Sequence, residues 1–132
     1  MQEMSFSQFL KEKRRLKEIT VRDMASMADV SAGYYCDIES GRRNPPDRKI
    51  IDKMLTALNV SEEDRIIFYD LAGKARSEAP PDLPEYINQH EEVRTALRLA
   101  RNGGDTTRVW NRFIAFLEED DDVDYDGWMK KI

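Results

Sequence analysis

The sequence contains only one cysteine and one histidine among its 132 residues. A single cysteine excludes an intramolecular disulfide, and these two residues cannot supply the four ligands of a structural zinc site. No apolar run approaches the roughly 18–20 residues that a membrane-spanning helix needs, and the polar N-terminal segment lacks the apolar core of a signal peptide. We therefore expect a cytoplasmic protein that holds no metal and needs no cofactor.

Catalytic patterns are absent from the sequence as well. There is no glycine-rich phosphate loop, no nucleophile paired with a base, and no pair of carboxylates in an apolar setting. His90 has no second histidine to work with, so a solvated side chain in the sixth helix is a far commoner role for it than catalysis. The sequence predicts that the protein is not an enzyme.

The net charge of −5 is unevenly distributed along the chain. Residues 1–79 hold 14 basic and 14 acidic side chains, whereas residues 80–132 hold 7 basic and 12 acidic ones. The first part is locally basic at Lys11, Lys13, Arg14, Arg15, Lys17, Arg42 and Arg43. Phosphate binding depends on where cations lie and not on the total, so the acidic balance does not exclude nucleic-acid binding.

Capping signals predict a series of short helices in the first part of the chain. Ser5 with Gln8 forms a capping box for a helix near residues 6–17, and Thr20 with Asp23 repeats the device for a second helix. A third helix starts at Ser31 and is closed by Gly41. A fourth starts at Pro45-Pro46-Asp47, and a fifth starts at Ser61 and is closed by Gly73. This spacing predicts a compact all-α domain of five helices over residues 1–78.

A proline-rich linker at residues 79–84 separates this domain from a second helical part. Apolar periodicity predicts one helix over roughly 85–101 and another over roughly 105–119. The resulting α-hairpin, residues 85–119, is too small to bury its own core, so we expect it to pack on the first domain, on a second copy or on another protein. Residues 120–132 are expected to form an acidic flexible tail.

The segment from Thr20 to Pro46 is the most informative part of the sequence. Two short helices joined by a tight turn, followed by a Gly-Arg-Arg exit, are the layout by which a small domain presents one helix to the major groove of DNA. On a helical wheel, Tyr35 and Ile38 share one face of the third helix, and the opposite face carries small side chains. We expect the apolar face to be buried and the other face to be presented.

The segment Leu10–Leu58 resembles the phage-repressor-like helix-turn-helix domains, the Cro and lambda-repressor or xenobiotic-response-element type. Those domains often read Leu-Arg-x-x-Arg, Leu-Thr, Leu-Ala, Val-Ser, Tyr-Ile and Ile-Glu-x-Gly-x-Arg-x-Pro in that order. The matching residues here are Leu10-Lys11-Glu12-Lys13-Arg14, Ile19-Thr20, Met24-Ala25, Val30-Ser31, Tyr34-Tyr35 and Ile38-Glu39-Ser40-Gly41-Arg42-Arg43-Asn44-Pro45. The resemblance implies a lambda-repressor-like domain that binds double-stranded DNA, and an ion pair between Arg14 and Glu39.

The same resemblance implies which residues contact DNA. The start of the second helix lies over the backbone, the exposed face of the third looks toward base edges, and the tyrosine and two arginines contact phosphates or the minor groove. These residues are Thr20, Val21, Arg22, Ser31, Ala32, Gly33, Tyr34, Cys36, Asp37, Arg42 and Arg43. Cys36 is far more often a small contact residue than a redox sensor at such a position.

The sequence departs from the family pattern at two turns and on the reading face. Glu18 and Asp29 stand where the family has glycines, although aspartate tolerates the left-handed conformation. The reading face has no Arg, Gln or Asn for bidentate base contacts. We infer that specificity relies on thymine-methyl packing, close helix approach at Gly33 and DNA shape.

The expected function is that of a transcriptional regulator, a repressor that reads a palindromic operator as a homodimer. The dimer contacts would come from Phe68, Tyr69 and their neighbours or from the C-terminal hairpin. The alternative is a protein-interaction module or antitoxin-like regulator on the same scaffold, whose acidic C-terminal part, with Trp128 and Met129, binds a protein partner. The acidic run itself is a solvated tail, a competitor of DNA for the basic face, or a contact for a basic partner.

Overall fold

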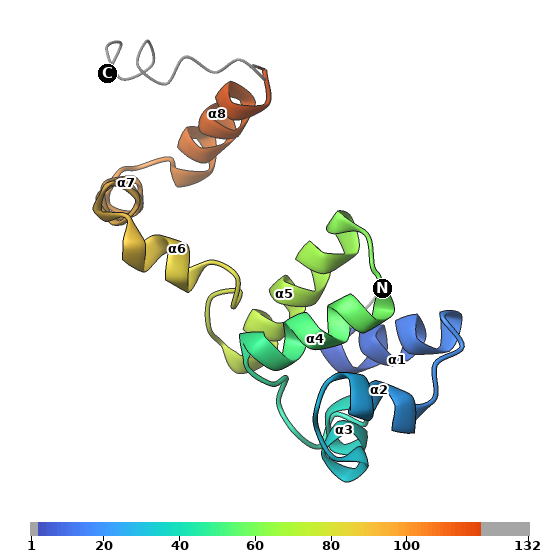
Figure 1. Cartoon of the computed structure of the whole chain (residues 1–132). Helices are drawn as coiled ribbons and strands as arrows, with labels where there is room; N and C mark the ends of the chain where they lie inside the picture. Colours follow the sequence, from blue (N-terminus) through green and yellow to red (C-terminus); the bar gives the residue numbers. More distant parts are fainter. Residues whose placement is uncertain (1–2, 120–132) are drawn as a thin grey trace. The chain divides into compact units, whose positions relative to one another are not determined.

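The computed structural model of the chain describes residues 3–119, which form helices joined by turns and loops and contain no strand (Figure 1). The predicted all-α class is confirmed. The described helices are α1 (Phe6–Leu16), α2 (Val21–Met27), α3 (Ala32–Glu39), α4 (Arg48–Leu58), α5 (Glu62–Arg76), α6 (Pro84–Gln89), α7 (Glu91–Asn102) and α8 (Thr106–Glu118). None of them combines the length and the hydropathy that crossing a bilayer requires. The predicted tail at residues 120–132 lies outside the described part, as do Trp128 and Met129.

Each of the helices α1 to α5 begins at a polar side chain whose oxygen accepts a hydrogen bond from a backbone N–H of the first turn. The donor–acceptor distances lie between 3.1 and 3.2 Å, and the capping residues are Ser5, Thr20, Ser31, Asp47 and Ser61. The predicted capping box of Ser5 with Gln8 is present. At α4 the two prolines precede the cap, and the aspartate that follows them satisfies the first turn.

The core of the first unit, which ends at Tyr86, is built from one apolar face of each of α1 to α5. Its largest fully buried side chains are Tyr35, Phe68, Leu10, Met24, Ile38, Ile51, Met54, Leu55 and Leu58. Phe68 of α5 packs edge-on against Phe6, with ring centroids 5.8 Å apart, and against Phe9 at 4.6 Å. Burial of each such side chain contributes roughly 1.5–3 kcal/mol, so this core holds the helix-turn-helix segment in place.

The burial of α5 corrects one expectation about dimerisation. Phe68 and Tyr69 are 0% and 5% exposed in the monomer, so neither side chain is available to a second copy. Their neighbours Ile66 and Ile67 are the outward apolar residues of α5, at 56% and 42% exposed.

The predicted end of the fifth helix at Gly73 is also wrong. The helix continues to Arg76 and is closed by Ser77, which adopts the left-handed conformation. Gly73 lies buried within it, where an added Cβ would come within 2.8 Å of Glu78 and Pro80 backbone atoms. The glycine therefore permits a close approach of chain to helix and does not terminate the helix.

The predicted single helix over residues 85–101 is two helices, α6 and α7, with His90 in an extended conformation between them. Arg94 stabilises the break between the two helices, because its guanidinium donates hydrogen bonds to the carbonyls of Ile87 and Asn88 at 3.0 and 2.7 Å. The carbonyl of Ile87 also accepts from the amide of His90 at 3.4 Å, so Arg94 supplements one backbone hydrogen bond and satisfies a second carbonyl at the end of α6. His90 thus lies between helices and not inside one.

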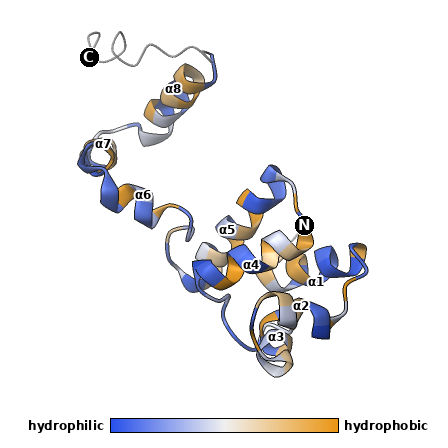
Figure 2. Cartoon of the chain, in the orientation of Figure 1, coloured by the Kyte–Doolittle hydropathy of each residue, from blue (hydrophilic) through white to orange (hydrophobic). Residues whose placement is uncertain are grey.

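In the second unit, which begins at Ile87, α7 and α8 pack on each other. Only Ala100, at 9% exposed, approaches full burial among the described residues of this unit. Figure 2 shows hydrophobic residues in orange along α8, and several of them remain accessible. Val109, Ile114 and Leu117 are 50%, 48% and 42% exposed. Among the described residues of this unit, none covers the apolar surface of these helices.

Both residues that replace the family's turn glycines have positive φ angles. Glu18 has a φ of 57° and Asp29 a φ of 60°, so each turn beside α2 uses the left-handed region. The expectation that the turn survives with aspartate is confirmed, and the glutamate adopts the same conformation. For a residue with a Cβ this conformation costs roughly 1–2 kcal/mol.

We predict that Glu18→Gly raises the free energy of unfolding by about 1 kcal/mol, because the relief of left-handed strain outweighs the greater entropy of unfolded glycine. Lys17→Gly is the matched control, since Lys17 has a φ of −86° and should lose stability on the same change. Chemical denaturation of both variants measures the difference. Equal destabilisation by the two changes would contradict the strain at Glu18.

Candidate nucleic-acid interface

The helix α3 is fixed by its apolar face. Tyr35 and Ile38 are 0% exposed, and α3 packs against α1 and α2. The opposite face remains accessible: Gly33 and Cys36 are exposed and Asp37 is half-buried. The predicted division of α3 into a buried and a presented face is confirmed. A helix held in this way can enter a groove without deforming.

The ion pair between Arg14 and Glu39 joins α1 to the end of α3. The guanidinium donates to the carboxylate through Nε at 2.9 Å and through Nη2 at 2.6 Å, with the side chains 13% and 7% exposed. Its Nη1 donates to the carbonyl of Ile19 at 2.9 Å, in the turn that precedes α2. The pair that the family resemblance implies is therefore present, and it connects three elements at one point.

Protonation equilibria in this cluster follow from the ion pair. Burial is the largest single effect and disfavours ionised Glu39, but the interactions with Arg14, Tyr35 and Lys11 together outweigh it, so the pKa of Glu39 is lowered. The hydrogen bond to Glu39 raises the pKa of Arg14. Burial, and then the carboxylate of Glu39, raise the pKa of Tyr35, whose hydroxyl is buried beside the pair without meeting hydrogen-bond geometry. All three groups therefore keep their neutral-pH charge states over a wide pH range.

The loop that leaves α3, residues 41–46, holds its two arginines against α3 itself. Arg43 lies over the ring of Tyr34, with its guanidinium carbon 4.8 Å from the centroid, and Arg42 approaches the carboxylate of Asp37 at 3.8 Å. The amide of Arg43 donates to the carbonyl of Asp37 at 3.1 Å. The structure thus brings together four of the sequence-predicted residues at the C-terminal end of α3.

Asp37 consequently has a second role beside the suggested contact with a base. Its carboxylate lies near Arg42, so part of its negative charge is offset before any phosphate approaches. The remaining predicted residues occupy other places. Ala32 and Gly33 lie in the first turn of α3, and Thr20, Val21 and Arg22 lie at the start of α2. The side-chain oxygens of Thr20 and Ser31 serve as helix caps.

The basic segment of α1 is partly structural. Arg14 is used by Glu39, and Lys13 forms a 3.0 Å ion pair with Asp64 while its amine lies 5.1 Å from the ring centroid of Phe9. Lys11, Arg15 and Lys17 are exposed. The surface available to a phosphate on α1 is smaller than the sequence suggests.

A support of α3 from α1 carries no local sequence signal. The hydroxyl of Ser7 donates to the carbonyl of Ile38 at 2.9 Å and so satisfies one of the last carbonyls of α3. Gly41 follows with a φ of +82°, and an added Cβ there would meet that same serine at 3.5 Å. Only the tertiary packing of α1 on α3 reveals this contact.

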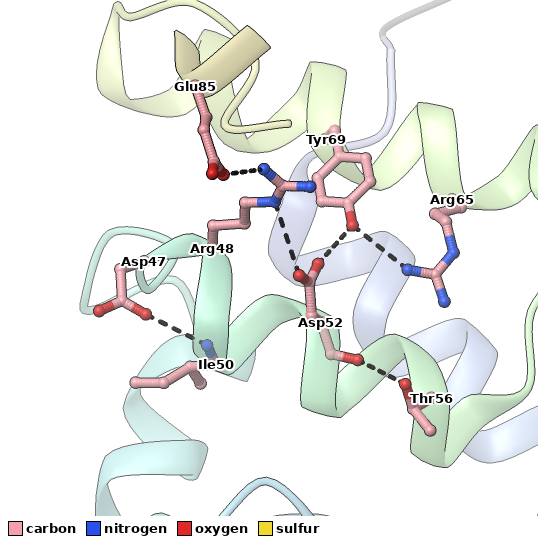
Figure 3. Close-up of polar contacts among 8 residues, drawn as sticks. All are labelled: Asp47, Arg48, Ile50, Asp52, Thr56, Arg65, Tyr69 and Glu85. Carbon is pink, nitrogen blue, oxygen red and sulfur yellow. Dashed lines mark hydrogen bonds and ion pairs between the residues drawn. The ribbon is translucent and has the colours of Figure 1, made fainter. Parts of the chain in front are cut away.

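A polar cluster connects α4 with α5 and with Glu85 (Figure 3). The hydroxyl of Tyr69 donates to the carboxylate of Asp52 and accepts from Arg65 at 3.2 Å. Arg48, in the first turn of α4, reaches Asp52 at 3.6 Å and Glu85 at 3.2 Å. Burial, followed by the hydrogen bond to Asp52, raises the pKa of Tyr69, so its hydroxyl stays protonated as a donor.

Comparison with known proteins found similarity over part of the chain. Residues 10–64 match a family model described as "Helix-turn-helix", so this segment is similar to that family. A solved structure titled "SinR protein/SinI protein complex" is similar to the chain, with 20% sequence identity over 96% of this chain and 99% of that chain and a TM-score of 0.41. No curated protein matches the chain. The match over residues 10–64 supports a DNA-binding transcriptional regulator, a role that is not typically enzymatic.

We predict that the ion pair makes stability depend on pH at acidic values. Because the folded-state pKa of Glu39 is lowered from 4.5, its contribution is present above that value and is lost as the pH falls through the lowered pKa. Glu39→Gln should lower the free energy of unfolding by about 2 kcal/mol at pH 7, and the difference from the parent should shrink toward pH 3. Urea denaturation across this range measures it. Glu12→Gln is the exposed control on α1, and parallel pH profiles of the parent and the Glu39 variant would contradict the assignment.

Proposed function

We propose that the protein is a repressor that binds a palindromic operator as a homodimer. The observation that carries the proposal is the fixed geometry of α3 and its exit: an accessible helix face followed at once by two arginines that α3 holds in place. A helix seated in the major groove would place that exit beside the phosphate backbone. A dimer on such a site would block access of polymerase to an overlapping promoter.

In this proposal, readout of bases relies on small groups. Ala32 packs against thymine methyl groups, Gly33 permits close approach of the helix, and Cys36 adds a short apolar contact. Asp37 accepts from a cytosine amino group, or instead serves to position Arg42. Because so few direct base contacts are available, sequence-dependent DNA shape supplies the remaining discrimination.

Contacts to phosphates come from the charged rim in this proposal. Arg42 and Arg43 approach the backbone at the end of α3, and Tyr34 both supports Arg43 and offers its hydroxyl. Thr20, Val21 and Arg22 lie over the backbone at the start of α2. An arginine held against a ring loses less side-chain freedom on binding than a free one does, which favours this exit as an anchor.

The homodimer is proposed on the apolar surface of the second unit. The described part of that unit buries little apolar area, and Val109, Ile114 and Leu117 of α8 are exposed. Two-fold contacts through such a surface match the symmetry of a palindromic operator. The exposed isoleucines of α5, Ile66 and Ile67, are the other candidate contact.

The same exposed side chains of α8 favour a second candidate function. An antitoxin-like regulator or interaction module would use that surface, together with the acidic C-terminal part, to bind a protein partner. Charge reversal at the exit of α3 separates the two proposals, because only DNA binding depends on it.

We predict that Arg42→Glu with Arg43→Glu abolishes specific DNA binding, with a loss of at least about 100-fold in affinity near 0.15 M salt, because two phosphate contacts become repulsions. Fluorescence anisotropy with a duplex selected by the parent protein measures the change. Arg98→Glu with Arg101→Glu on α7 alters the net charge equally and should retain most of the affinity. Retention of binding by the exit variant would argue for the interaction module.

Gly33→Gln should weaken binding by about 1 kcal/mol or more, because the added side chain keeps α3 away from the groove floor. No atom lies within 4 Å of a Cβ built at Gly33, so the free protein accommodates the change. Gly104→Gln is the matched control, since that glycine is equally open. Fluorescence anisotropy measures the Kd of both variants and of the parent for DNA. An unchanged Kd for the Gly33 variant would contradict close approach of α3 at Gly33.

A further inference from the structure

The segment after α5, residues 77–85, is attached to the first unit at both of its ends. Near the start, the amide of Glu78 donates to the carbonyl of Gly73 at 2.9 Å. At the other end, the carboxylate of Glu85 accepts from Arg48 of α4 at 3.2 Å, as Figure 3 shows. In between, the amide of Leu83 donates to the carbonyl of Pro80 and closes a turn. We call residues 77–85 the strap; it includes the linker that the prolines predict.

Gly73 decides how closely the strap can lie on α5. A Cβ at this position would come within 2.8 Å of the Glu78 carbonyl oxygen and the Pro80 nitrogen, and within 2.9 Å of the Ala79 carbonyl carbon. These neighbours are backbone atoms, which cannot move aside as a flexible side chain can. Any larger residue must displace the strap from the helix.

Arg76 connects this corner to the exit loop of α3. Its Nη1 donates to the carbonyl of Pro45 at 2.9 Å, and its Nε lies 3.5 Å from the carboxylate of Glu78. Pro46, Arg76 and Pro81 line the same cavity, so loop, helix and strap meet at one place. Pro45 and Pro46 are buried there, at the loop end that lies two residues beyond Arg43.

We propose that Arg76, with the strap docked over Gly73, fixes the conformation of the exit loop at residues 41–46 and so positions Arg42 and Arg43. The loop is then held at both ends: by the amide of Arg43 on the carbonyl of Asp37 at α3, and by Arg76 on the carbonyl of Pro45. Without the second attachment, the two arginines keep their charges, but the loop no longer holds them in a defined position. Arg76 acts as a positioning residue and makes no contact with DNA itself.

This inference rests on the proposed function only for its consequence in DNA binding. Arg76 and the strap lie after position 64, where the helix-turn-helix match ends, whereas the loop that they position lies inside it. The device is therefore a property of this chain's own continuation. It makes the first residues of the strap part of the DNA-binding module and not a spacer.

The first test uses the full chain without DNA. Amide hydrogen exchange of Arg43 reports directly on the loop, because its N–H is hydrogen-bonded to Asp37. Arg76→Met should accelerate that exchange by roughly tenfold, while the Tyr35 amide, in the core of α3, keeps its rate. Arg76→Lys should restore much of the protection, since an ammonium can still donate to the Pro45 carbonyl. Lys74→Met, two residues earlier and exposed, is the control. Unchanged exchange at Arg43 in the Met variant would overturn the proposal.

The second test measures DNA affinity in a double-mutant cycle. Arg76→Met should weaken binding by roughly tenfold in the parent but not in a background with Arg42→Ala and Arg43→Ala, because the positioned groups are then absent. An equal loss in both backgrounds would show a general structural role and refute positioning. If the parent binds no DNA, the proposed function fails, whereas the exchange result still decides whether Arg76 fixes the loop. Gly73→Ala offers an independent variant, which should loosen the same loop through the strap.

Discussion

The Arg14–Glu39 ion pair is the interaction on which the arrangement of the first unit most depends. Arg14 lies on α1, and its guanidinium donates both to the carboxylate at the end of α3 and to the carbonyl of Ile19 before α2. Three consecutive elements are thereby oriented around one low-dielectric contact, where hydrogen bonds to charged groups are strong. A pair buried in this way adds modest net stability but makes the alternative arrangements costly, because either charge left alone would lack a partner.

The position of the presented face follows from this anchor and from the loop beyond it. Tyr35 and Ile38 seat α3, and Ser7 satisfies its last turn, so the helix cannot rotate without exposing core. The exit loop is then fixed from α3 by the Asp37 carbonyl and from α5 by Arg76. An acidic protein can in this way offer DNA a small cationic site, because two arginines in defined places contribute more than a larger number of mobile charges.

Much of the first unit could be predicted because its signals are local. The caps at Ser5, Thr20, Ser31 and Ser61 and the buried face of α3 follow from side-chain chemistry within one or two turns. The Arg14–Glu39 pair could be predicted only through the family resemblance, because the two residues form a tertiary contact that is a feature of that family. Local rules failed where tertiary contacts decide: Gly73 reads as a helix end but serves close approach, and the break at His90 depends on Arg94 reaching back to the carbonyls before it. The contacts of Ser7 and Arg76 span 31 residues each and leave no pattern in the sequence.

The central claim is that α3 and its exit read a specific DNA site, and selection of bound duplexes from a random library tests it most directly. The selection should be made near 0.15 M salt, where binding through phosphates alone is weak. The account predicts recovery of a palindrome whose half-sites lie about one helical turn apart, as two copies of α3 related by a two-fold axis require. Recovery of no enriched sequence would contradict it and direct attention to a protein partner for α8.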